Sequence, residues 1–137
     1  MKNARELLLA YLDGFREPEK AAALFTNDGV LELPYLESLG LPSGVTGPEA
    51  IRSFLEDLLK NAPDFAFGET EILIDTPDQV FAEYRVDTVL ANGRRYQQLY
   101  AGRLVACDGK IALLRESLDL VHAARAMLPG GTADIPA

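Results

Sequence analysis

Apolar residues along this chain follow two different periods. Up to about residue 61 they recur every three or four positions, a spacing that places them on one face of a helix. From residue 65 onward they alternate with polar residues, which is typical of strands that bury one face. The pattern therefore predicts an α+β domain in which helices come first and a mostly antiparallel sheet follows.

The first part of the chain predicts three helices. Asn3 and Glu6 have the spacing of a capping box, so the first helix begins there. Pro18 and Pro48 each suit the first turn of a helix. The expected segments are a helix over 3–14, a helix over 18–25, a strand over 30–33, a long connection over 34–47 and a helix over 48–61. A connection of that length often covers a binding site.

The second part predicts a sheet and a closing helix. We expect strands over 65–75, 78–91, 94–107 and 110–121, with Gly68 as a candidate bulge, and a short helix over 121–128. No linker or repeat divides the chain. We therefore expect a single domain over 1–131, followed by a loose tail over 132–137.

Two turns predict the register of three neighbouring strands. Asn92-Gly93 and Asp108-Gly109 are typical of two-residue type I′ turns, because both dipeptides tolerate positive φ. With such turns, Tyr84 lies opposite Ala101, and Ala101 lies opposite Glu116. One face of the sheet then carries Ala82, Tyr84, Val86, Leu99, Ala101, Arg103, Leu114, Glu116 and Leu118. The opposite face is charged, so we expect the first face, here called the inner face, to pack on the helices.

Composition removes several function classes. The net charge is -8 and the pI near 4.6, so we expect no nucleic-acid partner. No apolar run approaches the length that spans a bilayer, so we expect no membrane partner. One cysteine and no secretory leader pattern fit the cytoplasm.

Familiar catalytic chemistry is also missing. Cys107 and His122 fall at opposite ends of neighbouring strands, too far apart for a nucleophile pair. One histidine and one cysteine make no metal cluster, and no glycine-rich nucleotide motif occurs. We therefore expect no metal and no cofactor.

Several segments together resemble one known family. They are LFTNDGVLELPY at 24–35, VTGPEAI at 45–51, AEY at 82–84, DGKI at 108–111 and RE at 115–116. Over about residues 5–130 the chain resembles the SnoaL-like family of the nuclear-transport-factor-two-like superfold, which includes ketosteroid isomerases, polyketide cyclases and phenazine-biosynthesis A/B proteins. The resemblance implies a cone-like α+β barrel, in which a curved sheet is wrapped by three N-terminal helices around a small-molecule pocket. It also implies a homodimer.

The resemblance implies site positions as well. The general base of ketosteroid isomerases falls at Leu33 and their oxyanion-hole acid at Ala101, so both carboxyls are missing. SnoaL-type polyketide cyclases place their acid/base at the second of these positions too. The phenazine proteins are more similar, because their pocket glutamate aligns with Glu116, although their helix histidine meets Phe54. Tyr11 falls roughly where the isomerase tyrosine projects from the first helix.

Glu116 is the main candidate for chemistry. Between Leu114 and Leu118 on the inner face, burial would raise its pKa and suit it to acid/base work. The alternative is a structural ion pair with Arg103, which would lower its pKa instead.

Aromatic and apolar residues complete the candidate pocket. Tyr84 and Tyr11 would donate hydrogen bonds to a ligand carbonyl or else to the backbone, and Tyr35 would swing in from the long connection or stay half-exposed. The expected lining is Tyr11, Tyr35, Arg103, Leu33, Phe54, Val86, Leu99, Ala101 and Leu118, with Glu116 and Tyr84 as the catalytic pair.

Three functions fit these observations. The first is a cofactor-independent isomerase, cyclase or dehydratase that acts on an apolar, ketone-bearing or polycyclic substrate. The second is a binding protein that uses the same pocket without chemistry, and the third is a dimerising scaffold.

Overall fold

The computed structural model describes residues 1–137 and contains four α-helices. They are α1 (Ala4–Gly14), α2 (Pro18–Ala22), α3 (Pro48–Asn61) and α4 (Leu120–Met127). The capping box is confirmed, since the Asn3 side chain accepts from the Glu6 amide at 2.9 Å and the Glu6 carboxylate accepts from the Asn3 amide at 3.1 Å. None of these helices has the length and apolar character needed to cross a bilayer.

Six strands form one curved sheet that does not close. The strands are β1 (Phe25–Glu32), β2 (Gly44–Thr46), β3 (Thr70–Asp75), β4 (Gln79–Val89), β5 (Arg95–Cys107) and β6 (Lys110–Leu118). Their order is β2-β1-β6-β5-β4-β3, and only the β1–β6 pair is parallel. The predicted α+β class with a mostly antiparallel sheet is confirmed.

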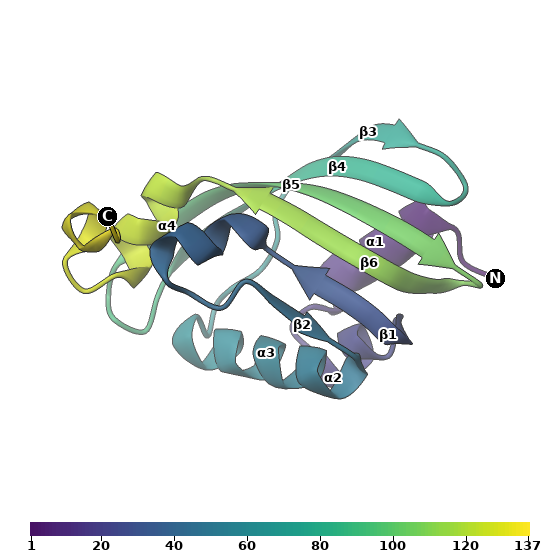
Figure 1. The fold of residues 1–137 in the computed structure, drawn as a ribbon. Helices are drawn as coiled ribbons and strands as arrows, with labels where there is room; N and C mark the ends of the chain where they lie inside the picture. The colour runs from purple at the N-terminus through teal and green to yellow at the C-terminus, as the bar shows by residue number, and fades with distance from the viewer.

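The helices cover the inner face of this sheet. Figure 1 shows α1 lying against β5 and β6, with α2 and α3 beyond β1 and β2, and α4 at the end of the sheet farthest from the N-terminus. Leu7, Leu8 and Tyr11 of α1 are fully buried together with Leu104 and Leu114 of the sheet. The core therefore lies between α1 and the strands.

Several predicted boundaries differ from the structure. The second helix ends at Ala22 rather than continuing to Phe25, because Phe25 pairs with Ile111 at the start of β1. The segment 65–69 is not part of a strand, and the bulge in β3 lies between Ile72 and Ile74 rather than at Gly68. The connection after β1 is ordered, with a 3-10 helix η1 (Pro34–Leu39) before β2. A second, η2 (Gly131–Asp134), follows α4.

The β4–β5 turn is one residue longer than predicted. Asn92 does not have positive φ, whereas Gly93 has φ 83°. The Leu90 amide donates to the Arg94 carbonyl at 2.8 Å and the Gly93 amide donates to the Leu90 carbonyl at 2.9 Å, which makes a three-residue loop. Tyr84 therefore lies opposite Tyr100 and not opposite Ala101.

The β5–β6 turn is predicted correctly, but a bulge follows it. Asp108 and Gly109 have φ 50° and 76°, which suits a type I′ turn. Pairing then shifts by one residue between Val105 and Ala106, so Gly102 rather than Ala101 lies opposite Glu116.

These two shifts add up to two residues between β4 and β6, so side chains on those strands keep their predicted faces, whereas β5 is shifted by one residue. Tyr84 and Glu116 are both buried on the inner face, as predicted. Strand β5 is turned over, because a one-residue slip moves every side chain to the other face. Its buried residues are Tyr96, Gln98, Tyr100, Gly102 and Leu104, whereas the predicted inward positions of Leu99, Ala101 and Arg103 are wrong.

Candidate functional site

A cavity of about 460 Å³ opens between the helices and the inner face of the sheet. Of its 21 lining residues 16 are hydrophobic, so its wall is mainly apolar. Buried residues such as Tyr11, Leu55, Tyr100 and Glu116 form the floor. The exposed lining residues form the rim, and they are Pro42, Asp57, Asn61, Asn92 and Met127. A pocket of this size and character fits a small, largely apolar molecule.

Glu116 and Tyr84 form a buried hydrogen bond at the floor. The Tyr84 hydroxyl donates to Oε2 of Glu116 at 2.6 Å, although the two residues come from strands separated by β5. The phenol crosses β5 at Gly102, where an added Cβ would clash with the Tyr84 hydroxyl and lie 2.9 Å from its Cζ. Gly102 is therefore required for this contact.

Burial makes Glu116 a weaker acid than an exposed carboxyl. Loss of solvation raises the pKa of this carboxyl from 4.5 to about 7, and the hydrogen bond from Tyr84 lowers it by a smaller amount. Its second oxygen, Oε1, has no hydrogen-bond partner in the chain. The carboxyl is therefore partly ionised near neutral pH, with one oxygen free.

Tyr11 places a second phenol at the floor. Its ring is 1 % exposed and packs edge-on against Phe15 and Phe25, with ring centroids 5.9 Å apart in both pairs. Burial, and to a smaller extent the charge of Glu116, raise its pKa well above 10, so the phenol stays protonated. No group of the chain accepts its hydroxyl proton.

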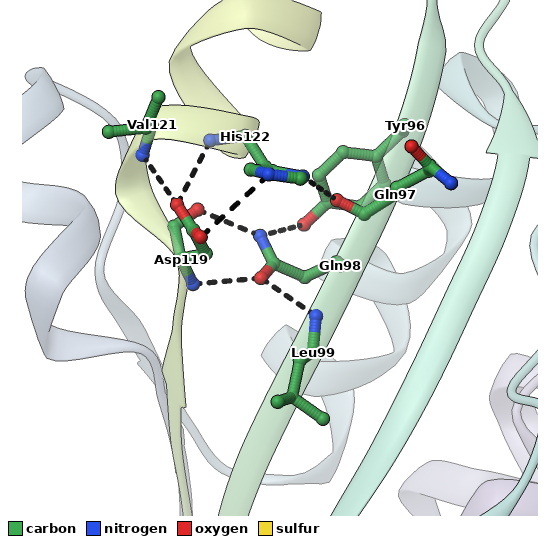
Figure 2. Close-up of polar contacts among 7 residues, drawn as sticks. All are labelled: Tyr96, Gln97, Gln98, Leu99, Asp119, Val121 and His122. Carbon is green, nitrogen blue, oxygen red and sulfur yellow. Dashed lines mark hydrogen bonds and ion pairs between the residues drawn. The ribbon is translucent and has the colours of Figure 1, made fainter.

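A second buried polar cluster lies on β5. Figure 2 shows the Gln98 amide held by the backbone of Asp119: Nε2 donates to the Asp119 carbonyl at 2.9 Å and Oε1 accepts from the Asp119 amide at 2.8 Å. Nε2 also donates to the Tyr96 hydroxyl at 3.2 Å. The Asp119 carboxylate caps α4 by accepting from the amides of Val121 and His122.

The Tyr96 and Tyr100 hydroxyls share one hydrogen bond of 2.8 Å. The pair has two O–H protons, and only one is used between the two oxygens. Gln98 acts as a donor to Tyr96 and accepts no proton from it. One O–H of the pair is therefore available to an acceptor in the cavity, which both rings line.

No cationic side chain lines the cavity. The alternative of an ion pair between Glu116 and Arg103 is wrong, because Arg103 is exposed on the outer face while Glu116 bonds to Tyr84. Arg115 is exposed too and pairs with Glu32 at 2.9 Å. The buried carboxyl therefore has phenols rather than a basic group as its neighbours.

The remaining predicted site residues divide into two sets. Tyr11, Leu33, Phe54, Glu116 and Leu118 line the cavity. Tyr84 and Val86 are buried but do not line it, Tyr35 is 51 % exposed, and Leu99 and Ala101 lie on the outer face.

Sequence reasoning missed five central residues of the site. Tyr96, Gln98 and Tyr100 share the alternation of Leu104, a clearly apolar position, and that signal places them inward. Phe65 and Phe67 fall within the predicted strand over 65–75, but they lie in the segment before β3 and line the cavity.

Metal-ligand clusters are not a feature of this structure, since no group of three or more His, Cys, Asp or Glu side chains is placed to hold an ion. Cys107 is exposed and unpaired. The Nδ1 atom of His122 lies 2.9 Å from the Gln97 carbonyl, and His122 does not line the cavity. The buried titratable groups of the cavity are therefore one carboxyl and several phenols.

The chain belongs to the SnoaL-like domain family, whose model matches residues 8–114. This confirms the predicted family. Among solved structures, it is similar to a putative isomerase from Bacillus subtilis, with TM-score 0.80, 23% identity and 94% of each chain covered. A comparison with curated proteins gives no match.

Two further structures have the same fold. A phenazine biosynthesis-related protein from Pseudomonas aeruginosa has TM-score 0.75 and 21% identity, covering 98% of this chain and 86% of its own. A putative polyketide cyclase from Pseudomonas putida has TM-score 0.77 and 17% identity, covering 92% of this chain and 98% of its own. At these identities the likeness concerns the fold, and function has to be argued from the site.

Proposed function

We propose that the cavity binds a small, largely apolar molecule with a ketone oxygen, and that Glu116 moves a proton on it, as in a cofactor-independent isomerase or cyclase. The observation that supports this most is a buried carboxyl whose pKa is about 7 and whose Oε1 atom has no partner. Such a group both takes and returns a proton near neutral pH.

In the proposed reaction, Oε1 of Glu116 takes a proton from the carbon beside the ketone. The C–H electron pair forms the C=C bond of an enolate, and the C=O pair moves to oxygen. The free O–H of the Tyr96–Tyr100 pair donates to that oxygen and stabilises its charge. Glu116 then returns the proton to the same carbon or to a conjugated one.

Hydrogen–deuterium exchange tests the proton transfer without knowledge of the natural substrate. 2-Tetralone is a neutral, bicyclic ketone, and its acidic C–H protons are followed by proton NMR in D2O. We expect the wild type to accelerate exchange and Glu116→Gln to lose about 100-fold or more of that acceleration. Glu83→Gln, on the outer face of β4, is the matched control and should keep it. Equal acceleration by wild type and Glu116→Gln would overturn the role of Glu116.

The other two functions give different results in the same assay. A pure binding protein would show a ligand-dependent rise in melting temperature without exchange, because binding to the folded state alone stabilises it. A scaffold would show neither exchange nor a ligand-dependent rise in melting temperature.

The homodimer implied by the family resemblance is tested separately by sedimentation at low micromolar concentration, where a monomer would contradict it.

A further inference from the structure

The cavity that contains Glu116 has acidic and phenolic side chains but no basic side chain in its lining. The cavity lining contains none of the chain's 13 Lys and Arg residues and not its histidine, whereas Asp57 of α3 contributes a second carboxylate at the rim. The other titratable groups near Glu116 come from α1, β4 and β5, and they are Tyr11, Tyr84, Tyr96 and Tyr100. When Glu116 is ionised, its charge has one phenolic hydrogen bond and no counterion.

Aromatic rings form much of the wall around this charge. One is on α1, one directly follows α1, one is on α3, two precede β3 and two are on β5. Their packing is dense: Phe65 and Phe67 have centroids 5.2 Å apart, and Phe67 and Tyr100 have centroids 5.8 Å apart. Ring faces attract cations, and the attraction grows where water is excluded.

We infer that this cavity also binds lipophilic ammonium ions, with the cation at the floor opposite the free oxygen of Glu116 and among the aromatic rings. The inference rests on the proposed use of the cavity as a small-molecule site and adds a second class of ligand. An ammonium ion supplies the counterion that the chain does not, and the apolar part of the ligand buries the remaining wall. The net charge of -8 also attracts a cation toward the protein.

The same charges disfavour an anionic ligand. It would lie near Glu116 and Asp57 with no basic side chain to pair with, so the cavity selects against carboxylates and phosphates. A neutral ketone of the proposed reaction fits the same space, and the ammonium ion therefore acts as its competitor.

Phenyltrimethylammonium and tert-butylbenzene make a matched pair of probes. They have nearly the same shape, but only the first carries a charge, and that charge does not titrate. Any change of its affinity with pH therefore reports on the protein. With the pKa of Glu116 at about 7, the ionised fraction rises from about 3 % at pH 5.5 to about 97 % at pH 8.5. If only the ionised carboxyl binds the cation, the dissociation constant falls about 30-fold over that range.

NMR titrations of the wild type and two variants test this inference. We expect phenyltrimethylammonium to bind tighter than tert-butylbenzene at pH 8.5 and to lose its pH dependence in Glu116→Gln. Glu83→Gln, on the outer face of β4 and outside the cavity lining, should keep the pH dependence. The inference is overturned if the charged probe binds no tighter than the neutral one, or if its pH dependence survives in Glu116→Gln.

Exchange of 2-tetralone on the same preparations separates this inference from the proposed function. Exchange without binding of phenyltrimethylammonium overturns the ammonium site and leaves the proton transfer standing. Glu116-dependent binding without exchange supports the ammonium site and overturns the proton transfer. If both hold, the cation should inhibit exchange competitively. Circular dichroism of both variants, which are isosteric replacements, shows that loss of binding is not loss of fold.

Discussion

Replacing Glu116 by Gln removes a group whose protonation is coupled to folding. In the folded protein the pKa of Glu116 is about 7, against an ordinary value of 4.5. Between these two pH values the folded state holds a proton that the unfolded state releases. The contribution of Glu116 to stability is therefore complete below pH 4.5 and is lost as pH rises to 7.

The size of the effect follows from the same two values. A difference of about 2.5 pH units corresponds to about 3 kcal/mol, because each unit is worth about 1.4 kcal/mol. The carboxyl is 4 % exposed, so solvent screens little of it. Glu116→Gln keeps the size of the side chain and an acceptor for Tyr84 but cannot ionise. Relative to the wild type, the variant should therefore gain about 3 kcal/mol between pH 4.5 and pH 8.

Urea denaturation at a series of pH values measures this difference. The other carboxyls titrate in both proteins, so subtracting one stability curve from the other isolates Glu116. We expect the difference to change mainly between pH 4.5 and pH 7 and to level off above that range. Two curves that stay parallel to within about 0.5 kcal/mol would refute the burial argument for this carboxyl.

Three further variants test other contacts. Tyr84→Phe removes the hydrogen bond that lowers the pKa of Glu116, so the pH midpoint of 2-tetralone exchange should move upward; an unchanged midpoint would contradict this. Gly102→Ala forces the same phenol away from the carboxyl and should lower stability by about 1–3 kcal/mol in urea denaturation, whereas wild-type stability would show that the ring has room. Arg94→Ala removes a guanidinium that donates to the carbonyls of Arg125, Leu128 and Pro129, so amide exchange in α4 should accelerate. Arg95→Ala, which breaks an exposed pair with Asp87, is its control and should leave α4 exchange unchanged.

The elements of this fold could be predicted largely from local sequence signals. The capping box at Asn3, the apolar stripe of α3 and the turn at Asp108-Gly109 each specify their structure within a few residues. Phe25 shows where this fails, because an apolar residue after a short helix fits helix or strand equally. Pairing with Ile111, which is 86 residues farther along the chain, decides between them.

The candidate site was predicted in part, for a reason that lies in the sheet register. Glu116 and Tyr84 reach the inner face because two one-residue shifts, at the Leu90–Arg94 loop and after Val105, add up to two residues between their strands, and a two-residue shift leaves each side chain on the same face. The strand between them keeps a single shift, so Tyr100 replaces Ala101 in the cavity wall. Dipeptide preferences alone do not distinguish a two-residue from a three-residue loop at Asn92-Gly93, since both place Gly93 at positive φ.

Asp119 joins two parts of the molecule that would otherwise be independent. Its carboxylate begins α4, the helix that brings Met127 to the rim, while its backbone orients Gln98 and through it the phenol pair deep in the cavity. Changes to α4 that admit larger ligands would therefore also reorient the O–H of the Tyr96–Tyr100 pair, which is the proposed proton donor. Efforts to widen access and efforts to retune reactivity have to be planned as one design problem in this scaffold.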